Sequence, residues 1–439
     1  MILFLNIRYA GIIQSENNNP LEVYITENNI KNEIITKAIL AAADCGEYDC
    51  ESSMKELEEL AKTAGAEVAA QVVQKRPAPE PATVLGEGKI EELRDLTEQL
   101  EADLIIFDCE LTASQIRNIE KIVNVRVIDR TMLILDIFAG RAVSNEGKLQ
   151  VELAQLKYRL PRLAGIGASM SRLGGGIGTR GPGETKLETD RRHIRSRINK
   201  LEENLKELEK RRDFSRSRRK KDNVLTAAIV GYTNAGKSTL LNNLTGANVL
   251  AEDKLFATLD LTSRGIELPD GRTVIVIDTV GLIRRLPHNL VEAFKSTLEE
   301  AASADIILHV CDISDSEAAE KAETTSSLLA ELGCGEIPVI NVLNKCDLLE
   351  NNIPESSDTV KICAKTGEGF DRLLKAIAEN LPESAKRIKL LLPYDKGNLT
   401  ARIREKGKIF SEEYKENGIE VDALADIAIL KELSPFEIK

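Results

Sequence analysis

The segment GYTNAGKS, residues 231–238, combines glycines, a lysine and a hydroxyl at a spacing that suits a phosphate group. It follows an apolar run that predicts a buried strand, and a Leu-rich stretch that predicts a helix comes next. In that context Gly231 and Gly236 let backbone N–H groups crowd around phosphate oxygens. Lys237 supplies a positive charge at the β- and γ-phosphates, and the Ser238 hydroxyl is a suitable Mg²⁺ ligand. The pattern alone fits ATPases, kinases and GTPases equally.

Two further segments would complete the site around the γ-phosphate. An apolar strand ends at Asp278, which is placed to hold Mg²⁺ through water, and the amide of Gly281 can sense the γ-phosphate. Between the phosphate loop and Asp278 lies Leu255–Asp260, where we expect Thr258 to close over Mg²⁺. Thr262 is the alternative for that role.

Two short segments, each directly after an apolar strand further along the chain, are expected to select the base of the nucleotide. In Asn344-Lys345-Cys346-Asp347, the Asp347 carboxylate can accept hydrogen bonds from N1–H and the exocyclic amine of guanine. Adenine lacks that pair of donors and would leave a buried charge unpaired. Lys345 would lie along the base, and the Ala364 amide of Cys363-Ala364-Lys365 can meet the guanine O6. The sequence therefore predicts a site for GTP and GDP.

The expected residues form three sets. Nucleotide contacts are expected from Gly231, Tyr232, Thr233, Asn234, Ala235, Gly236, Lys237, Ser238, Thr239, Asp278, Asn344, Lys345, Asp347, Cys363, Ala364 and Lys365. The expected catalytic residues are Lys237, Thr258 and Gly281. The expected Mg²⁺ ligands are Ser238, Thr258 and, through water, Asp278.

The residue after Gly281 predicts how fast GTP is hydrolysed. Many GTPases have a glutamine there to orient the attacking water, and this chain has Leu282, which makes no hydrogen bond through its side chain. We therefore expect slow intrinsic hydrolysis and stimulation by a partner. Asn234 is either a ligand for K⁺ that replaces an arginine finger or a residue that only stabilises the loop.

The elements around this site predict several α/β parts. Repeated strand and helix patterns from residue 34 to 146 predict a small parallel α/β domain. Residues 223–382 carry the GTPase motifs, and 387–439 predict a small α+β domain with strand-like runs at 388–392, 408–414 and 426–430 and a helix near 397–405. Residues 1–33 have no assigned role.

Residues 147–222 predict an antiparallel helical hairpin and a basic linker. Leu149, Leu153, Leu156, Leu160 and Leu163 have coiled-coil spacing, and Ile194, Ile198, Leu201, Leu205 and Leu208 repeat it. The Gly-rich loop 164–185 would form the tip. From Lys157 to Lys220 the chain has 19 Lys and Arg against eight Asp and Glu, in a protein of net charge −12. A basic arm on an acidic protein indicates a surface for a polyanion, with contacts expected from Arg172, Arg180, Arg191, Arg192 and Arg195.

Composition excludes other classes. The 439 residues are 42% hydrophobic, enough for several cores, and 4% aromatic with no Trp, which disfavours a platform for stacking bases. Seven cysteines without paired CxxC units and three scattered histidines disfavour a zinc centre. No apolar stretch approaches the roughly 18 residues of a membrane span, so we expect no membrane span and a cytoplasmic location.

Four segments beyond the guanine motifs resemble the HflX family of translational GTPases. They are FDCEL at 107–111, VIDRT at 127–131, KLQVELAQL at 148–156 and GPGET at 181–185. The resemblance runs from about residue 50 to the C-terminus, with Cys363 standing where serine is common.

That resemblance implies an N-terminal α/β domain, a helical hairpin, a Ras-like GTPase domain and a small C-terminal domain. It also implies that the polyanion is RNA of the large ribosomal subunit, and that GTP-dependent separation of stalled ribosomes during stress is the function. A GTP-gated RNA-binding or ribosome-assembly factor is the alternative. We expect a monomer off the ribosome.

Overall fold

The computed structural model describes residues 36–163, 182–246, 255–256, 262–285, 300–348, 356 and 358–438. The chain divides into two compact units. One unit contains Met1–Gly140 and Val151–Ile198, and the other contains Arg141–Gln150 and Asn199–Lys439. Each unit is described by itself.

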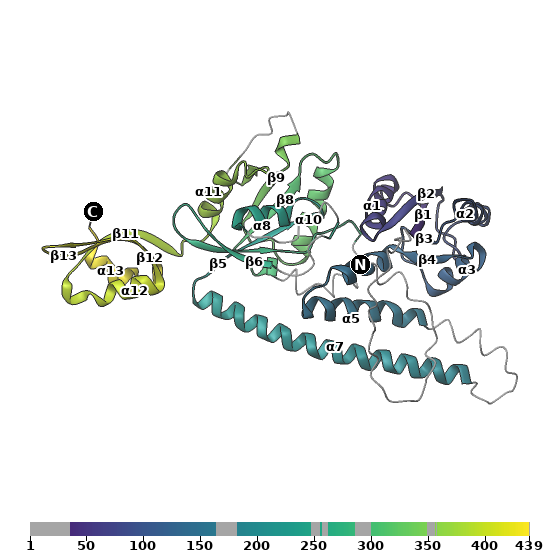
Figure 1. The fold of residues 1–439 in the computed structure, drawn as a ribbon, viewed down its shortest axis with the longest axis horizontal. Helices are drawn as coiled ribbons and strands as arrows, with labels where there is room; N and C mark the ends of the chain where they lie inside the picture. Colours follow the sequence, from purple (N-terminus) through teal and green to yellow (C-terminus); the bar gives the residue numbers. More distant parts are fainter. Residues whose placement is uncertain are drawn as a thin grey trace, which may run out of the picture. The chain divides into compact units, whose positions relative to one another are not determined.

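The N-terminal domain is a parallel sheet with the strand order β2-β1-β3-β4 (Figure 1). Its strands are β1 (Thr36–Asp44), β2 (Ala66–Lys75), β3 (Leu104–Phe107) and β4 (Arg126–Asp129). Its helices are α1 (Cys50–Thr63), α2 (Glu87–Leu100), α3 (Ala113–Val123) and α4 (Arg130–Arg141). All of β3 is buried, as a parallel strand covered by helices requires. The expected parallel α/β fold is confirmed.

Two helices follow this domain, α5 (Asn145–Arg162) and α7 (Pro182–Lys221). Arg197 binds Glu152 through two contacts of 2.7 and 2.8 Å, and Arg212 binds Glu146 at 2.9 Å. The two pairs run in opposite sequence directions, so the helices are antiparallel (Figure 1). At about 1.5 Å per residue, the 40 residues of α7 span about 60 Å.

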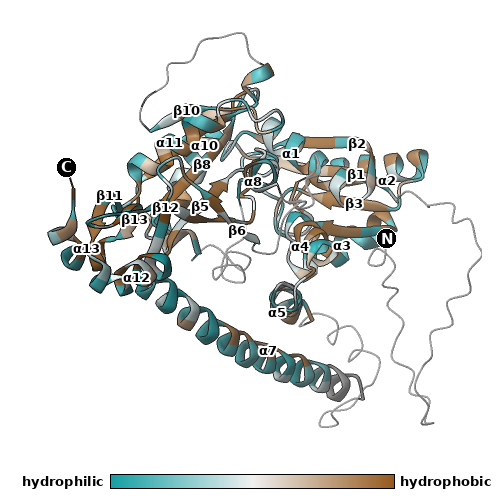
Figure 2. Ribbon diagram, turned by 60° about the vertical axis from the view of Figure 1, so that its left-hand side comes forward, coloured by the Kyte–Doolittle hydropathy of each residue, from teal (hydrophilic) through white to brown (hydrophobic). Residues whose placement is uncertain are grey.

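The residues of the two predicted seams are only partly buried in the structure. Leu153, Ile198 and Leu201 are buried, and the other seam residues of the two helices are half-buried. Most of α7 is hydrophilic, as Figure 2 shows by its colour. Most of the Gly-rich loop, residues 164–181, lies outside the described residues, and α7 already begins at Pro182.

The GTPase domain is a six-stranded sheet with the order β10-β9-β8-β5-β7-β6, antiparallel only between β6 and β7. Its strands are β5 (Leu225–Gly231), β6 (Thr262–Glu267), β7 (Thr273–Asp278), β8 (Ile306–Asp312), β9 (Val339–Asn344) and β10 (Thr359–Lys361). Its helices are α8 (Lys237–Thr245), α10 (Ala318–Glu331) and α11 (Phe370–Asn380). Because β5, β7, β8 and β9 are parallel, their carboxyl ends meet at one edge.

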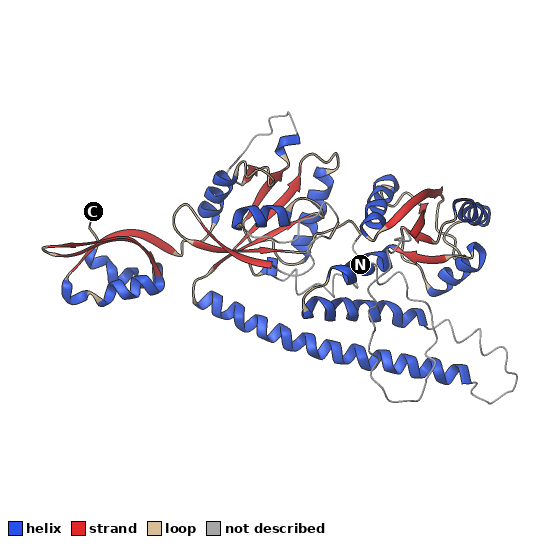
Figure 3. Cartoon of the chain, viewed as in Figure 1, coloured by secondary structure: helices blue, strands red, loops and turns tan. Residues whose placement is uncertain are grey.

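The C-terminal domain is an antiparallel sheet, β11-β13-β12, with two helices on one face (Figure 3). Its elements are β11 (Ala385–Leu392), α12 (Asn398–Lys406), β12 (Gly407–Lys415), β13 (Gly418–Asp426) and α13 (Ile427–Leu433). The prediction of a strand over 426–430 was wrong: the last strand ends at Asp426. Ile429 and Leu433 are both buried, four residues apart, and that is the spacing of a helix face rather than a strand.

None of the helices in the described ranges combines the length and the apolar character needed to cross a bilayer.

Candidate nucleotide-binding site

The phosphate loop joins a fully buried strand, β5, to the first turn of α8. The Lys237 ammonium is buried and donates to the carbonyl oxygens of Gly231 at 3.1 Å and Tyr232 at 2.7 Å. These bonds hold the ammonium across the loop. Thr233 is also buried, and its hydroxyl has no hydrogen-bond partner within the part of the chain that the structure describes. A loop with a buried, unused hydroxyl and a buried cation fits an oxyanion.

Gly236 is needed at the start of α8 for two reasons. Its φ of +92° lies in the left-handed region, and a Cβ there would come 2.2 Å from the Asn344 side-chain nitrogen. Asn344 needs that space, because its Nδ2 donates to the Ala235 carbonyl at 2.8 Å while its Oδ1 accepts from the Ala364 amide at 2.9 Å. Asn344 therefore joins the phosphate loop to the predicted base-binding loop.

The predicted Mg²⁺ ligands from the described residues lie together. Ser238 Oγ donates to Asp278 Oδ2 at 2.8 Å, and Asp278 is fully buried at the end of β7. A hydroxyl beside a carboxylate is a hard oxygen donor set, which suits Mg²⁺. Thr258 lies outside the described residues, whereas Thr262, the alternative, opens β6 and pairs with Asp278. The choice between the two threonines stays a prediction.

Burial changes the acidity of Lys237, which is predicted to be catalytic. It lowers the pKa of Lys237 to about 8 from its usual 10.5, and the nearby Asp278 carboxylate opposes that change. A Cβ at Gly281 would lie 3.1 Å from the Lys237 ammonium, so the amide expected to sense the γ-phosphate is beside this charge. Phosphate oxygens bound there would replace the water molecules that burial excludes from the Lys237 ammonium.

The two segments predicted to bind the base follow β9 and β10 at the same edge of the sheet. Asp347 is exposed within the short 3₁₀ helix Cys346–Leu348, and Lys345 is held by Asp312 at 2.6 Å. Asp312, at the end of β8, was missed by the sequence analysis, although an acidic residue closing an apolar strand was a usable signal.

The second loop predicted to bind the base is held by a contact from α8 and by a hydrogen bond within the loop. Asn243 donates to the Ala364 carbonyl at 2.6 Å, a contact that the sequence pattern did not indicate. The buried Cys363 donates its amide to the Glu368 carbonyl at 3.0 Å. Because the Ala364 amide donates to Asn344, a guanine O6 would have to share or replace that bond. Its contact with the base stays a prediction, as does that of the exposed Lys365.

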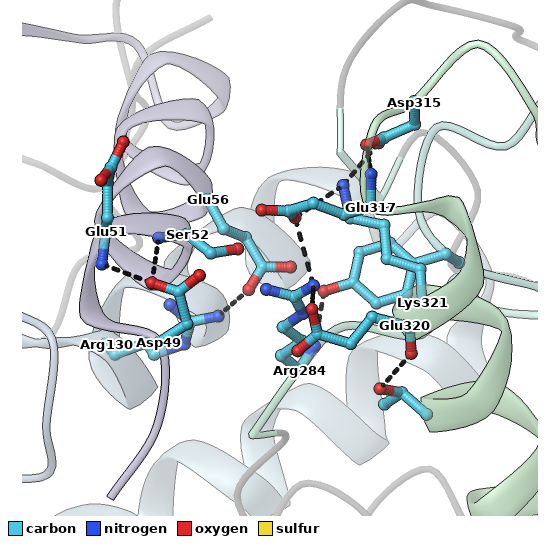
Figure 4. Close-up of polar contacts among 12 residues, drawn as sticks. Asp49, Glu51, Ser52, Glu56, Arg130, Arg284, Asp315, Glu317, Glu320 and Lys321 are labelled. Atoms are coloured by element: carbon cyan, nitrogen blue, oxygen red, sulfur yellow. Dashed lines mark hydrogen bonds and ion pairs between the residues drawn. The ribbon is translucent and has the colours of Figure 1, made fainter. Parts of the chain in front are cut away.

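Tyr232 and the residues after Gly281 face α10. The Tyr232 side chain is buried, its hydroxyl accepts from the Arg284 amide at 2.7 Å, and the Lys321 ammonium lies 5.4 Å from its ring. Figure 4 shows the Arg284 guanidinium beside Glu317 and Glu320, at 3.1 and 2.9 Å. The Tyr232 side chain is therefore occupied, so its predicted contact with the phosphates would come from its backbone, and Arg284 is bound to α10 rather than placed as a finger.

Other predicted residues have clear positions. Asn234 is exposed with φ of +62°, Thr239 is half-buried in α8, and Leu282 is buried. On α7, Arg192 and Arg195 are exposed and Arg191 is half-buried. Arg172 and Arg180 lie outside the described residues.

Comparisons with known proteins cover most of the chain. Residues 51–139 match the family described as GTP-binding GTPase N-terminal, 141–219 its middle region, and 226–345 the family described as 50S ribosome-binding GTPase. The GTPase HflX of Caldanaerobacter subterraneus is 54% identical over 402 residues, 92% of this chain and 94% of that protein.

The chain belongs to the HflX family of GTPases. The HflX proteins of Lacrimispora saccharolytica and Escherichia coli are 50% and 44% identical and are covered over 94% and 87% of their lengths. This member of the family therefore binds and hydrolyses GTP, in a family associated with ribosomes. Among solved structures, the chain is similar to the GDP complex of SsGBP, at 25% identity over 79% of this chain and 98% of that one, with a TM-score of 0.45.

Proposed function

We propose that this GTPase binds the large ribosomal subunit through its helical arm and separates stalled ribosomes while GTP is bound. The observation that carries the proposal is the basic, exposed surface of α7 in a chain whose GTPase domain matches 50S ribosome-binding GTPases. Arg192 and Arg195 are exposed on this helix, where they can reach phosphates. Arg197, which binds Glu152 across the hairpin, is excluded from that set.

The described residues support a division of roles in hydrolysis. Lys237 neutralises charge on the phosphates, the Gly281 amide meets the γ-phosphate, and Ser238 and Asp278 would hold Mg²⁺. Mg²⁺ bound there supplies further neutralisation of the phosphate oxygens. Leu282 holds no water, because its side chain is apolar and only 2% exposed, so intrinsic hydrolysis is slow and the ribosome stimulates it. K⁺ at Asn234 would add a second stimulus.

Co-sedimentation with ribosomes in GDP and in a non-hydrolysable GTP analogue tests the binding step. We expect binding to the large subunit with the analogue and much less with GDP. Release of free subunits from stalled ribosomes, followed by light scattering, tests the separation step. Binding without separation, combined with faulty subunit maturation in cells that lack the protein, would support the assembly factor instead.

Changing Arg191 and Arg192 to Ala tests the arm. Removing one phosphate contact lowers the slope of log affinity against log salt by about 0.7–0.9, so the variant should bind less tightly and with a flatter salt dependence. Changing Lys89 and Arg94 of α2 to Ala removes the same charge from another helix and is the matched control. An equal effect of both variants would show that only net charge matters and would contradict a contact along α7.

A further inference from the structure

The β6–β7 hairpin connects the nucleotide site to the opposite end of the GTPase sheet. At its open end Thr262 pairs with Asp278, the predicted Mg²⁺ residue, and the antiparallel pairing continues to Glu267 and Thr273. At about 3.4 Å per residue, the five steps of this ladder span about 17 Å. β7 also pairs with β5 as far as Ile229 and Asp278, so the position of Asp278 depends on the ladders on both sides of β7.

The closed end of the hairpin packs on the C-terminal sheet, within one compact unit of the chain. Gly271 has φ of +89°, and a Cβ there would lie 2.7 Å from Phe410 Cζ and 3.7 Å from Leu424 Cδ2. Only a glycine gives the turn both this conformation and this approach to the ring. The hairpin backbone thus rests directly on Phe410 of β12.

Arg272 fastens the same turn to the segment that leads into the C-terminal domain. Its guanidinium is 9% exposed and donates to the carbonyl oxygens of Pro382, at 2.8 Å, and Ala378. Its Nε also binds Asp270 of the turn at 2.7 Å. Displacing a buried guanidinium from these acceptors costs free energy, so Arg272 is a second attachment of the turn beside the contact with Phe410.

The Phe410 ring also contacts an ion-paired guanidinium. The Arg387 guanidinium lies 4.5 Å from its centroid, and two hydrogen bonds of 3.0 and 2.9 Å fix that guanidinium to Asp422. Lys408, two residues before the ring, reaches Glu267 of the hairpin at 2.6 Å. The ring is 39% exposed, and it contacts both the hairpin turn and an ion-paired guanidinium.

We propose that Phe410 is a positioning residue for the nucleotide site, acting through the β6–β7 hairpin on Asp278 and Thr262. Contact with the C-terminal domain fixes the position of the hairpin turn. The β6–β7 ladder transmits that position to the end of β7. Removal of the Phe410 ring reduces the contribution that Mg²⁺ makes to nucleotide affinity. Contacts of the base follow β9 and β10, which do not pair with the hairpin, and they should not change.

Phe410→Ala separates this role from a general loss of stability. GDP release from the full-length protein is followed by fluorescence over a series of Mg²⁺ concentrations and in excess chelator. The Mg²⁺ concentration that halves the release rate should rise about fivefold, while the rate in chelator stays the same. Phe410→Tyr should restore the wild-type value. Tyr414→Ala, which removes a 71% exposed ring from the same strand, is the matched control and should change neither rate.

A surface pair beside Phe410 provides a second test, because the Lys408 ammonium binds Glu267 and also lies 5.8 Å from the centroid of the Phe410 ring. Lys408→Glu places a second carboxylate against Glu267 and should raise the Mg²⁺ requirement about threefold, since both side chains are partly exposed to solvent. Glu267→Lys in the same protein restores the opposite charges and should reverse the change. An unaltered Mg²⁺ requirement in Phe410→Ala and Lys408→Glu would overturn the proposal, as would an equal rise in the release rate with and without Mg²⁺.

Discussion

At the scale of single residues, we predict that choice of the base depends on one exposed carboxylate. Asp347 lies beside Lys345, which Asp312 holds at 2.6 Å, so the loop that presents the carboxylate is braced. Asp347→Asn should exchange guanine for xanthine specificity, because the amide offers a donor where the exocyclic amine of guanine requires an acceptor, and xanthine has a carbonyl oxygen at that position. Competition between GTP and xanthosine triphosphate measures the exchange. Asp371→Asn, at an exposed position of α11, is the control. Loss of GTP binding without gain for xanthosine triphosphate would exclude Asp347 as the base reader.

The Lys237 ammonium makes nucleotide binding depend on pH. Burial lowers its pKa to about 8 in the nucleotide-free protein, and bound phosphates favour the charged form, so the pKa rises on binding. Above pH 8 binding must therefore take up a proton, and affinity should fall by up to about tenfold per pH unit. Below pH 8 the lysine is charged in both states and this dependence disappears.

Calorimetry in two buffers of different ionisation enthalpy measures that proton directly. At pH 8.5 we expect uptake of more than about half a proton per GDP. In Lys237→Arg the guanidinium stays charged at every accessible pH, so the uptake should vanish in whatever binding remains. Uptake of the same size in both proteins would assign the proton to another group.

At the scale of elements, Leu282 joins the phosphate loop to the core. Its side chain is 2% exposed, its carbonyl accepts from the Thr233 amide at 2.8 Å, and its amide donates to the Gly231 carbonyl at 3.2 Å. Leu282→Ala should reduce the free energy of unfolding by about 2–5 kcal/mol, because it leaves a cavity. The affinity of the folded protein for GDP should change little, since the backbone bonds remain.

Urea denaturation and GDP titration measure the two effects of Leu282→Ala separately. Leu348→Ala, at a 63% exposed leucine in the 3₁₀ helix Cys346–Leu348, is the control and should leave the free energy of unfolding nearly unchanged. Faster GTP hydrolysis in Leu282→Ala would mean that the leucine blocks the attacking water instead of only failing to hold it.

At the scale of the whole molecule, a buried polar cluster attaches α5 to the N-terminal domain. The fully buried Asp129, at the end of β4, accepts from the Tyr158 hydroxyl, from Arg162 at 3.3 Å and from the Leu111 amide at 3.0 Å. The Arg162 guanidinium lies 3.4 Å from the centroid of the Tyr158 ring. Burial, followed by the Asp129 charge, raises the pKa of Tyr158 well above its usual range, so the phenol remains a donor.

Tyr158→Phe should lower the free energy of unfolding by about 1–3 kcal/mol, because a buried carboxylate loses one of its donors. The remaining donors limit the loss. Tyr394→Phe removes a phenol at a 56% exposed ring and should cost much less. Equal losses in the two variants, measured by urea denaturation, would show that the cluster does not fasten the arm.

The sequence alone was sufficient for the parts of this protein that local chemistry controls. The strand, loop and helix around Lys237, the end of β7 at Asp278 and the Asn344–Asp347 segment could be predicted because each motif and its flanking apolar run lie within a few residues. The two helices of the arm could be predicted for the same reason, since their seams repeat along one stretch of chain.

Only the tertiary structure decided the contacts that join distant segments. Nothing near Asn344 indicated that its amide would join Ala235 to Ala364, and nothing near Gly271 indicated that it would rest on Phe410. The apolar run after Asp426 fits a strand as well as a helix, and packing of its buried side chains against the C-terminal sheet selected the helix α13. Such pairings depend on which elements the fold brings together, and the periodicity of a single segment carries no information about its neighbours in space.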